Sequence, residues 1–182
     1  MTDSLDAYDF PLPEELIALR PAQPRDAARL LVVNAAKPGS IADAGVLELA
    51  DFLKSGDVLV ANDTRVIHAR LRGIRHRGDA EAHIELLLHK PMPDPGHWQA
   101  FARPAKRLKP GETVECVEGL KAHIVSRDGG EVVVRLEAAG QTLDEAIASA
   151  GEMPLPPYIE GKRKADARDE EDYQTVFAQA DG

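Results

Sequence analysis

The sequence HIELLLH at residues 83–89 opens the stretch that decides the fold class. Four more strand-like runs follow it at short intervals: Trp98–Arg103, Thr113–Val117, Leu120–Ser126 and Glu131–Leu136. Turn-forming sequences separate the runs: PDPG at 93–96, KPG at 109–111 and DGG at 128–130. Short strands at this spacing, with almost no helical periodicity, are typical of a small antiparallel barrel or sandwich. We therefore predict that residues 69–146 form a small antiparallel β-barrel.

The flanking sequence mixes helix and strand signals. After the barrel, Thr142 and Glu145 form a capping box that predicts a helix ending at Gly151. Before the barrel the patterns alternate: a helix start at 13–18, a strand at 29–34, a helix at 46–53 and a continuously apolar strand at 58–61, expected to be buried on both faces. The predicted fold class is α/β, in which residues 1–68 and 147–182 belong to an incomplete large α/β domain and the barrel is inserted between them.

Residues 153–159 read MPLPPYI, directly after the predicted helix. Each proline fixes φ near about −65° and pushes the preceding residue toward extended or polyproline II geometry. The segment should therefore be stiff and extended, and it should hold Leu155, Tyr158 and Ile159 at fixed offsets. By itself such a segment is typical of a connector.

Composition limits the classes of function. The net charge of −9 argues against a general polyanion binder, and the single cysteine, Cys116, allows no intramolecular disulfide. A lone cysteine suits a reducing compartment. The N-terminus lacks the apolar region of a signal peptide, and no apolar run approaches the length of a membrane span. We expect a cytoplasmic protein that binds no membrane.

Positive charge nevertheless gathers in three clusters. The range Arg65–Arg77 contains five arginines, two histidines and no acid. Residues 162–164 (KRK) form another cluster, and the remaining one consists of Arg103, Lys106, Arg107 and Lys109. Each cluster is either a solvated surface or part of a face that contacts phosphates.

Several catalytic signatures are absent. The sequence contains no G-x-G-x-x-G after a strand, no P-loop, no H-E-x-x-H and no G-x-S-x-G. The histidines at positions 68, 76, 83, 89, 97 and 123 show no ligand-type clustering with cysteine or carboxylate, so we expect them to be structural or at the surface.

Three motifs resemble the S-adenosylmethionine:tRNA ribosyltransferase-isomerase family of queuosine biosynthesis. They are Asn62-Asp63-Thr64-Arg65-Val66-Ile67, the segment MPLPPYI at 153–159, and Asp169 followed by Tyr173-Gln174-Thr175-Val176. Residues 9–18 and 55–60 resemble the family as well, so the similarity spans the whole chain.

The resemblance implies an enzyme that transfers the ribosyl part of S-adenosylmethionine to the 7-aminomethyl-7-deazaguanine (preQ1) wobble base of tRNA. The ribosyl group isomerises to give epoxyqueuosine, and adenine and methionine are released. S-adenosylmethionine is thus a co-substrate, tRNA bearing preQ1 is the partner, and no metal is expected. Family members continue beyond the position of Gly182 with a stretch reading AAPTAGLHF. The resemblance therefore implies that this chain is the N-terminal part, inactive without the missing C-terminal half.

The chemistry suggests candidate catalytic residues. A base must take protons from the aminomethyl group and an acid must assist adenine departure, for which Asp63, Asp169 and Asp172 are candidates. A sulfonium cation favours a carboxylate or an aromatic face nearby, so Asp63 and Tyr158 are candidates to contact it. The alternatives are an Asx turn for Asp63 and a core position for Tyr158.

The same motifs supply candidate binding residues. Arg65 could hold a phosphate or the methionine carboxylate, or instead pair with Asp63. Tyr173 could stack on an unpaired base or lie in the core, and Gln174 and Thr175 could read a base edge or cap a strand. The predicted cofactor-binding set is Asn62, Thr64, Arg65, Pro156 and Pro157, and the predicted tRNA-binding set is Arg70, Arg72, Tyr173, Gln174 and Thr175. A non-catalytic tRNA-binding or structural fragment remains the alternative to an enzyme.

Overall fold

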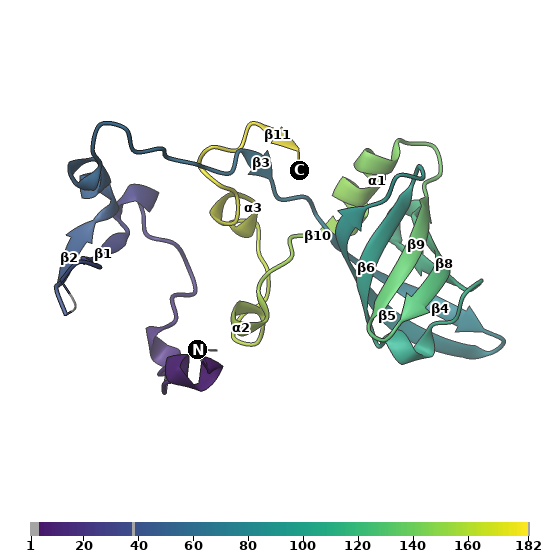
Figure 1. The fold of residues 1–182 in the computed structure, drawn as a ribbon. Coiled ribbons are helices and arrows are strands. Elements are labelled where there is room, and N and C mark those ends of the chain that lie inside the picture. The colour runs from purple at the N-terminus through teal and green to yellow at the C-terminus, as the bar shows by residue number, and fades with distance from the viewer. Residues whose placement is uncertain (1–3, 38, 182) are drawn as a thin grey trace. The chain divides into compact units, whose positions relative to one another are not determined.

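The computed structural model describes residues 4–37 and 39–181 (Figure 1). The chain divides into two compact units, Met1–Val60 and Ala61–Gly182. No helix within the described ranges is long and apolar enough to cross a membrane.

The second unit contains a closed antiparallel β-barrel. Its strands are β4 (Arg70–Arg77), β5 (Ala80–Pro91), β6 (His97–Arg103), β7 (Thr113–Cys116), β8 (Lys121–Asp128) and β9 (Glu131–Glu137). They are joined in the order β4-β5-β6-β9-β8-β7, and β7 pairs back with β4 to close the sheet. Two short 3₁₀ turns, η5 (Ala105–Arg107) and η6 (Val117–Gly119), lie in its connections. The predicted antiparallel barrel is confirmed, and the sandwich alternative is excluded.

Alternating side chains build the barrel core. On β5, Ile84, Leu86 and Leu88 are buried, and on β9 Val132 and Val134 are buried. The residues between them face outward, as a pleated strand requires. The five strand-like runs quoted above all fall on strands β5 to β9.

Strand β4 was not predicted, because its inward positions do not look like a core. Leu71 points inward, but the next two inward positions are Gly73 and Arg75. Arg75 is only 5% exposed, and its Nη2 donates to the Arg107 carbonyl at 3.0 Å. A buried arginine that satisfies a carbonyl of a neighbouring turn replaces an apolar residue here.

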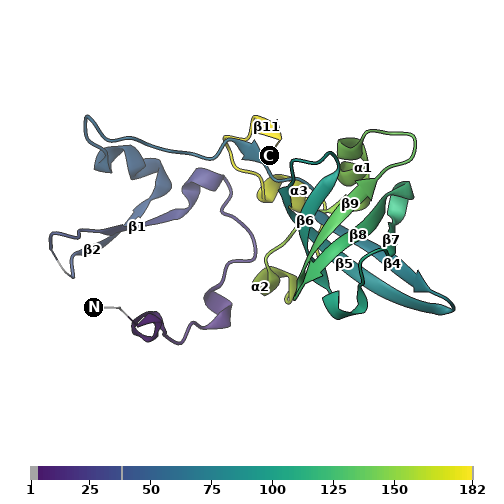
Figure 2. The ribbon, with the colours of Figure 1, turned by 45° about the vertical axis from the view of Figure 1, so that its right-hand side comes forward.

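A helix covers one end of the barrel. This is α1 (Leu143–Ala150), which lies across the strand ends in Figures 1 and 2. The predicted capping box is present: Glu145 N donates to Thr142 Oγ1 at 3.3 Å, and Thr142 N donates to Glu145 Oε2 at 2.9 Å. Ala146 and Ile147 pack into the barrel core. The predicted helix is confirmed, and β10 (Gly151–Glu152) follows it and pairs with β4.

The remaining elements of the second unit are short. They are β3 (Thr64–Arg65), α2 (Pro157–Glu160), α3 (Asp169–Asp172) and β11 (Ala180–Asp181). Strands β3 and β11 pair in parallel.

The first unit has one hairpin and a few helical turns. Strands β1 (Arg29–Val33) and β2 (Ile41–Gly45) pair antiparallel, which confirms the strand predicted at 29–34. The helical turns are all 3₁₀: η1 (Leu5–Tyr8), η2 (Glu14–Leu16), η3 (Arg25–Ala27) and η4 (Val46–Phe52). The helix signals at 13–18 and 46–53 therefore give η2 and η4 rather than α-helices.

The buried strand predicted at 58–61 is wrong. These residues form no strand, and the side chains of Val58 and Val60 are 84% and 88% exposed. A strand buried on both faces needs neighbours to pair with and to pack on, and no other described residue supplies them. Among the described residues, the buried apolar side chains begin only at Ala69. The α/β part of the predicted fold class stays a prediction.

Closure of the barrel depends on Gly73. A Cβ added there would lie 2.5 Å from the Glu115 carbonyl oxygen and 2.8 Å from Val114 Cγ1, on the strand that closes the barrel. We expect Gly73→Ala to destabilise the protein by about 1–3 kcal/mol, the usual cost of overpacking. Urea unfolding followed by circular dichroism measures this. Gly130→Ala is the control, because its Cβ would meet nothing within 4 Å; equal stability of both variants would contradict the prediction.

Candidate functional site

The segment that enters the barrel and the segment that follows it are joined side by side. Val66 N donates to Gln174 Oε1 at 2.8 Å, and Gln174 Nε2 donates to the Val66 carbonyl at 3.0 Å. Gln179 N also donates to the Asp63 carbonyl at 2.8 Å, just before β3 and β11 pair. A side-chain amide that satisfies both polar groups of one residue acts like an added strand. The motifs NDTRVI and YQTV are thereby brought together.

Asn62 shapes the start of this junction. Its Oδ1 accepts hydrogen bonds from Thr64 N at 3.1 Å and Thr64 Oγ1 at 2.7 Å, which is an Asx turn. The residue that closes the turn is thus Asn62, not Asp63. Asp63 is exposed, and its carboxylate has no hydrogen-bond or ion-pair partner among residues 4–37 and 39–181. Arg65 is exposed as well, and its side chain has no partner among the same described residues. Asp63 and Arg65 therefore do not form an ion pair.

A cleft of about 630 Å³ lies beside the junction. It is lined from the entry segment, from β6, from α1 and from α3, by residues that include Arg65, His68, Trp98, Asp144 and Glu170. An aromatic side chain, apolar residues and several charged groups around one cleft are the usual make-up of a small-molecule site.

His68 connects three of these walls. Its Nδ1 lies 2.8 Å from the Ala148 carbonyl in the last turn of α1, and its Nε2 lies 2.6 Å from Glu170 Oε2 on α3. Both partners accept hydrogen bonds, so the ring is satisfied only when both nitrogens carry protons. Burial lowers the pKa of His68, but the Ala148 carbonyl and Glu170 raise it by more, so the net shift is upward from 6.5.

The segment MPLPPYI lies against the first barrel strand. Met153, Leu155 and Ile159 are buried, while Tyr158 is 56% exposed. The prediction of an extended segment holds only as far as Pro156, whose ψ is 144°. Residues 157–160 form α2 instead, because a proline at the first helical position is pre-organised for a helix.

Arg70 fixes this segment in place. Its Nη1 donates to Glu160 Oε1 at 2.6 Å and its Nη2 donates to the Leu155 carbonyl at 3.0 Å, and the residue is only 6% exposed. Arg72 lies 3.3 Å from a Glu152 carboxylate oxygen and 3.6 Å from one of Glu85. Both arginines of the predicted tRNA-binding set are therefore engaged within the chain.

The two predicted catalytic aspartates of α3 are both buried. Asp169 is 0% exposed and accepts from both Arg163 Nη1 and Nη2, at 2.8 and 2.6 Å. Asp169 Oδ2 also accepts from Asp166 N at 2.8 Å. Asp172 is 8% exposed, with Arg168 Nη2 4.0 Å from its carboxylate. These contacts fit a structural role for Asp169, which holds the 163–169 turn closed.

The remaining predicted residues lie along the same segment. Pro156 is half-buried and Pro157 is the exposed first residue of α2. Tyr173 and Thr175 are half-buried, and Thr175 Oγ1 accepts from Phe177 N at 3.3 Å. Within the described ranges, no three histidine, cysteine, aspartate or glutamate side chains are grouped so that they could hold a metal ion.

A family model described as "Queuosine biosynthesis protein" matches residues 5–182. The chain belongs to this family. The S-adenosylmethionine:tRNA ribosyltransferase-isomerase of Methylorubrum populi is 53% identical to it over 196 residues, which covers 98% of this chain and 52% of the relative. The protein of the same name from Parvibaculum lavamentivorans is 53% identical over 176 residues, covering 96% and 50%. The chain thus spans about half the length of the curated relatives it matches.

A solved structure is also similar to this queuosine biosynthesis family member. It is the crystal structure of S-adenosylmethionine tRNA ribosyltransferase from Thermotoga maritima, which is 32% identical. The match covers 85% of this chain and 52% of that chain, with a TM-score of 0.37.

Four residues that line the cleft of this queuosine biosynthesis protein have no site role in the sequence-based prediction: His68, Trp98, Asp144 and Glu170. His68 is expected to be structural or at the surface, and its contacts with the Ala148 carbonyl and Glu170 fit a structural position that also borders the cleft. Nothing local marks His68, because its carboxylate partner is 102 residues away. Trp98 is the only tryptophan and was the one available signal.

The His68 contacts predict a pH dependence. Because its folded-state pKa is raised, the pair with Glu170 adds stability that is fully present below 6.5 and is lost as the pH rises through the folded-state pKa. An NMR titration should give His68 a pKa above 6.5, and Glu170→Gln should lower it. A His68 pKa unchanged by Glu170→Gln would contradict the assignment. His97, whose Nδ1 lies 3.1 Å from the Pro95 carbonyl and which has no hydrogen bond to Glu170, is the internal control.

The buried pair of Asp169 and Arg163 predicts a loss of stability. We expect Asp169→Asn to lower the melting temperature by several degrees, because it leaves the Arg163 guanidinium without its carboxylate. Differential scanning calorimetry measures the change. Asp128→Asn, at an exposed position on β8, should leave the melting temperature unchanged. A melt of Asp169→Asn like that of the wild type would argue for a catalytic rather than a structural aspartate.

Proposed function

We propose that this chain is the N-terminal part of an S-adenosylmethionine:tRNA ribosyltransferase-isomerase. In this role the protein transfers and isomerises the ribosyl group of S-adenosylmethionine onto preQ1 at the tRNA wobble position, and adenine and methionine leave. The observation that carries the proposal is the family match over residues 5–182, together with relatives of that name at 53% identity. Because the chain spans about half of those relatives, we propose that turnover also needs their C-terminal half.

The cleft beside the junction is the proposed place of the chemistry. It is bordered by the motif residues Arg65 and Gln174, and the exposed Asp63 lies in the same entry segment. An exposed, unpaired carboxylate can accept a proton, so we assign the general base to Asp63 rather than to the buried Asp169 or Asp172. Asp169 and Asp172 then position α3, which carries Glu170 to the cleft.

The binding roles follow from the same contacts. Arg65 is unpaired and available for the methionine carboxylate of the co-substrate, and Asn62 and Thr64 hold it in place through the Asx turn. Tyr158 exposes its ring and can face the sulfonium, while Pro156 and Pro157 fix its position. Gln174 and Thr175 support the backbone beside the cleft, and half-buried Tyr173 borders them.

The domain organisation is a proposal of the same kind. Residues 1–68 and 147–182 would belong to a large α/β domain, and residues 69–146 to the inserted barrel. The exposed apolar side chains of the first unit support it, since Leu31, Val33 and Leu47 on its hairpin and η4 are more than 60% exposed. Apolar surface of this extent marks a face that packs against other polypeptide.

Adenine release tests the proposed function. The full-length protein mixed with S-adenosylmethionine and preQ1-bearing tRNA should release adenine, and this 182-residue chain alone should not. In the full-length protein, Asp63→Asn should lower kcat by about 10²–10⁴-fold, as expected when a general base is lost. Turnover by the isolated chain at the full-length rate would overturn the need for the second half. A full-length protein that releases no adenine would favour a non-catalytic tRNA-binding fragment instead.

A further inference from the structure

Four cations on the outside of the barrel have no side-chain partner among the described residues. Arg103, Lys106, Arg107 and Lys109, here called the η5 cluster, are all exposed. Their side chains make no hydrogen bond or ion pair with any residue in the ranges 4–37 and 39–181. Four uncompensated positive charges within seven residues are unusual in a chain of net charge −9.

The arginines of β4 behave differently. Arg70 and Arg72 face glutamates, as described above, and Arg77 Nε donates to Glu112 Oε1 at 2.7 Å. Arg75 Nε lies 3.9 Å from the same glutamate. Although the β4 arginines and the η5 cluster look equivalent in the sequence, only the η5 cluster keeps its charge available for an anion.

The η5 cluster is held on a rigid base. Ala105 and Leu108, which alternate with its cations, are 9% and 1% exposed. The Arg107 carbonyl accepts from Arg75 Nη2 at 3.0 Å, and Lys109 N donates to Glu112 Oε2 at 2.8 Å. The backbone is thus fixed, while the charged ends point into solvent. Because the backbone is already ordered, less entropy is lost when a ligand binds.

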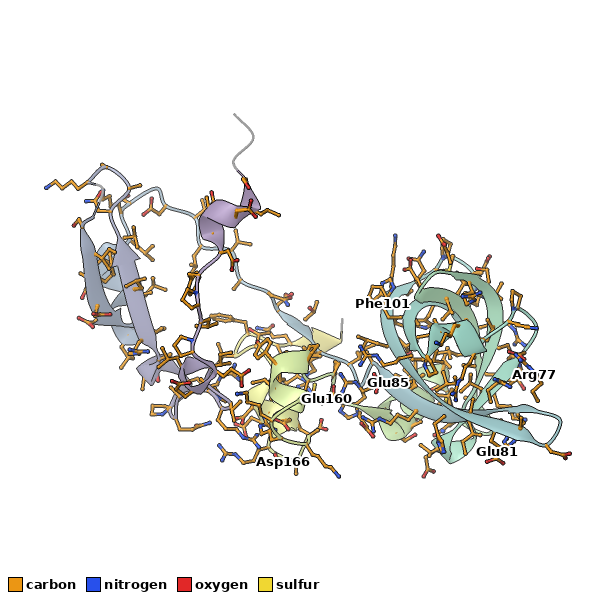
Figure 3. The ribbon with its side chains drawn as sticks, turned by 90° about the horizontal axis from the view of Figure 1, so that it is seen from below. Arg77, Glu81, Glu85, Phe101, Glu160 and Asp166 are labelled. Carbon is orange, nitrogen blue, oxygen red and sulfur yellow. The ribbon has the colours of Figure 1, made fainter. Side chains whose placement is uncertain are left out.

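An exposed aromatic pair lies next to the cluster. Phe101 is 54% exposed on the outer wall of the barrel (Figure 3), and it shares a face of β6 with Arg103, two residues along. Its ring stacks on His89 with centroids 4.5 Å apart and planes at 26°. The sheet register shifts between Leu88 and Lys90, so His89 is the extra residue of a bulge. Bulges re-aim side chains, and this one puts an imidazole beside the phenyl ring.

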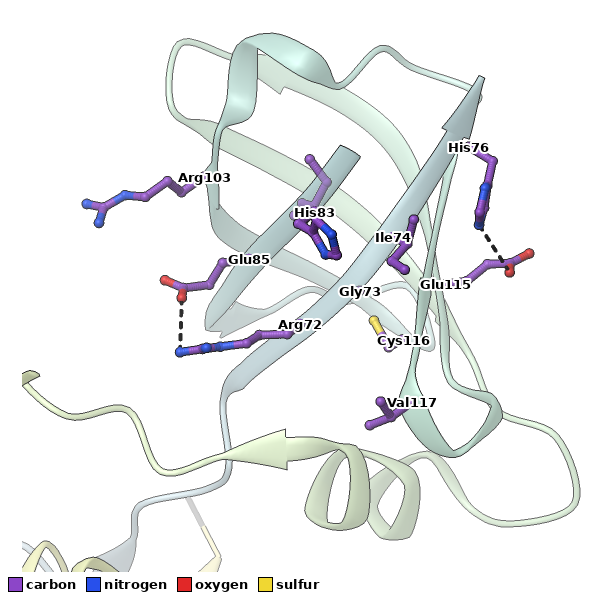
Figure 4. A pocket seen from close by; sticks show the side chains of 11 residues that line it. Arg72, Gly73, Ile74, His76, His83, Glu85, Arg103, Glu115, Cys116 and Val117 are labelled. Carbon is purple, nitrogen blue, oxygen red and sulfur yellow. Dashed lines mark ion pairs between the residues drawn. The ribbon is translucent and has the colours of Figure 1, made fainter. Parts of the chain in front are cut away.

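A groove continues this surface. It has a volume of about 740 Å³ and is lined by residues that include Arg103, His83 and Ile74 (Figure 4). Glu85, the cross-strand neighbour of Arg103, forms an ion pair with Arg72 at 3.6 Å, and Figure 4 marks none between Glu85 and Arg103. The nearby acid therefore does not neutralise Arg103.

We propose that the η5 cluster and the Phe101–His89 pair form a surface that binds the unpaired anticodon loop of tRNA. The cations contact its phosphates, and an unstacked base packs on the exposed face of Phe101. This inference rests on the proposed function and deepens it, since it places RNA on β6 and η5 and leaves Arg70 and Arg72 to position the MPLPPYI segment.

Salt-dependent RNA binding tests the cationic part. The probe is an unmodified anticodon stem-loop with guanine at the wobble position, bound to this chain in fluorescence anisotropy titrations over a range of salt. Lys106→Ala/Arg107→Ala should weaken binding by about tenfold and reduce the salt slope by about 1.4, because each single-strand phosphate contact contributes about 0.7. The control Lys121→Ala/Arg127→Ala removes the same charge from β8 and should change neither quantity.

Phe101 tests the stacking part. Phe101→Ala should weaken binding of the same probe by about fivefold or more while leaving the salt slope unchanged, because stacking releases no counterions. Phe101→Tyr keeps the ring and should bind like the wild type. Val125→Ala, at another exposed apolar position on the barrel, is the control.

The outcomes separate this inference from the proposed function. Two results would overturn the RNA surface even if the full-length protein releases adenine. One is that the chain does not bind the probe at low salt. The other is that the Lys106/Arg107 double variant binds it as well as the β8 control does. Loss of adenine release with the RNA-binding results intact would overturn the proposed function alone. Circular dichroism spectra matching the wild type show that each variant is folded.

Discussion

A buried arginine holds the chain against the barrel in the segment that follows β10. Arg70 is the first residue of β4, and its two terminal nitrogens hold Glu160 and the Leu155 carbonyl. A buried guanidinium is costly unless it is paired, and Glu160 and the Leu155 carbonyl pair its two terminal nitrogens, so the MPLPPYI segment is bound to the barrel at its entrance. Met153, Leu155 and Ile159 of the same segment are buried. The Gln174 bond to Val66 and the His68 bond to Glu170 then extend the same attachment along the returning chain.

Local patterns were enough to predict the barrel and the helix that covers it. Alternating apolar residues give β5 and β9, and Thr142 with Glu145 gives the start of α1, since both signals act within a few residues. Strand β4 is not predicted from the sequence, because its inward Arg75 donates its hydrogen bond to the carbonyl of a turn residue 32 positions away. The buried strand predicted at 58–61 is wrong for the opposite reason. An apolar run is buried only when other polypeptide covers it, and the described residues do not cover this one.

In the candidate site, local sequence likewise does not show which charged side chains are paired. The sequence shows the motifs NDTRVI and MPLPPYI, but it does not show which carboxylates are unpaired and which are hydrogen-bonded. That depends on partners far along the chain. Asp63 and Asp169 look alike as candidate bases, yet Asp63 is exposed and unpaired while Asp169 accepts two bonds from Arg163. Likewise Arg72 and Arg103 look alike as phosphate ligands, and the ion pairs of Arg72 with Glu85, Glu152 and Glu160 distinguish them.

An acidic protein can bind a polyanion only if its acids are kept away from the binding face, and this barrel achieves that by pairing. Glu85 is held by Arg72, Glu112 by Arg77, and Glu131 by His89 at 2.8 Å. The two arginine pairs offset negative charge that would otherwise repel phosphate near β6 and η5. The paired arginines therefore support RNA binding indirectly, by neutralising the carboxylates around a cluster whose own charges stay unpaired. Because salt screens surface charges and competes for phosphate contacts, we expect the affinity for RNA to fall as the ionic strength rises.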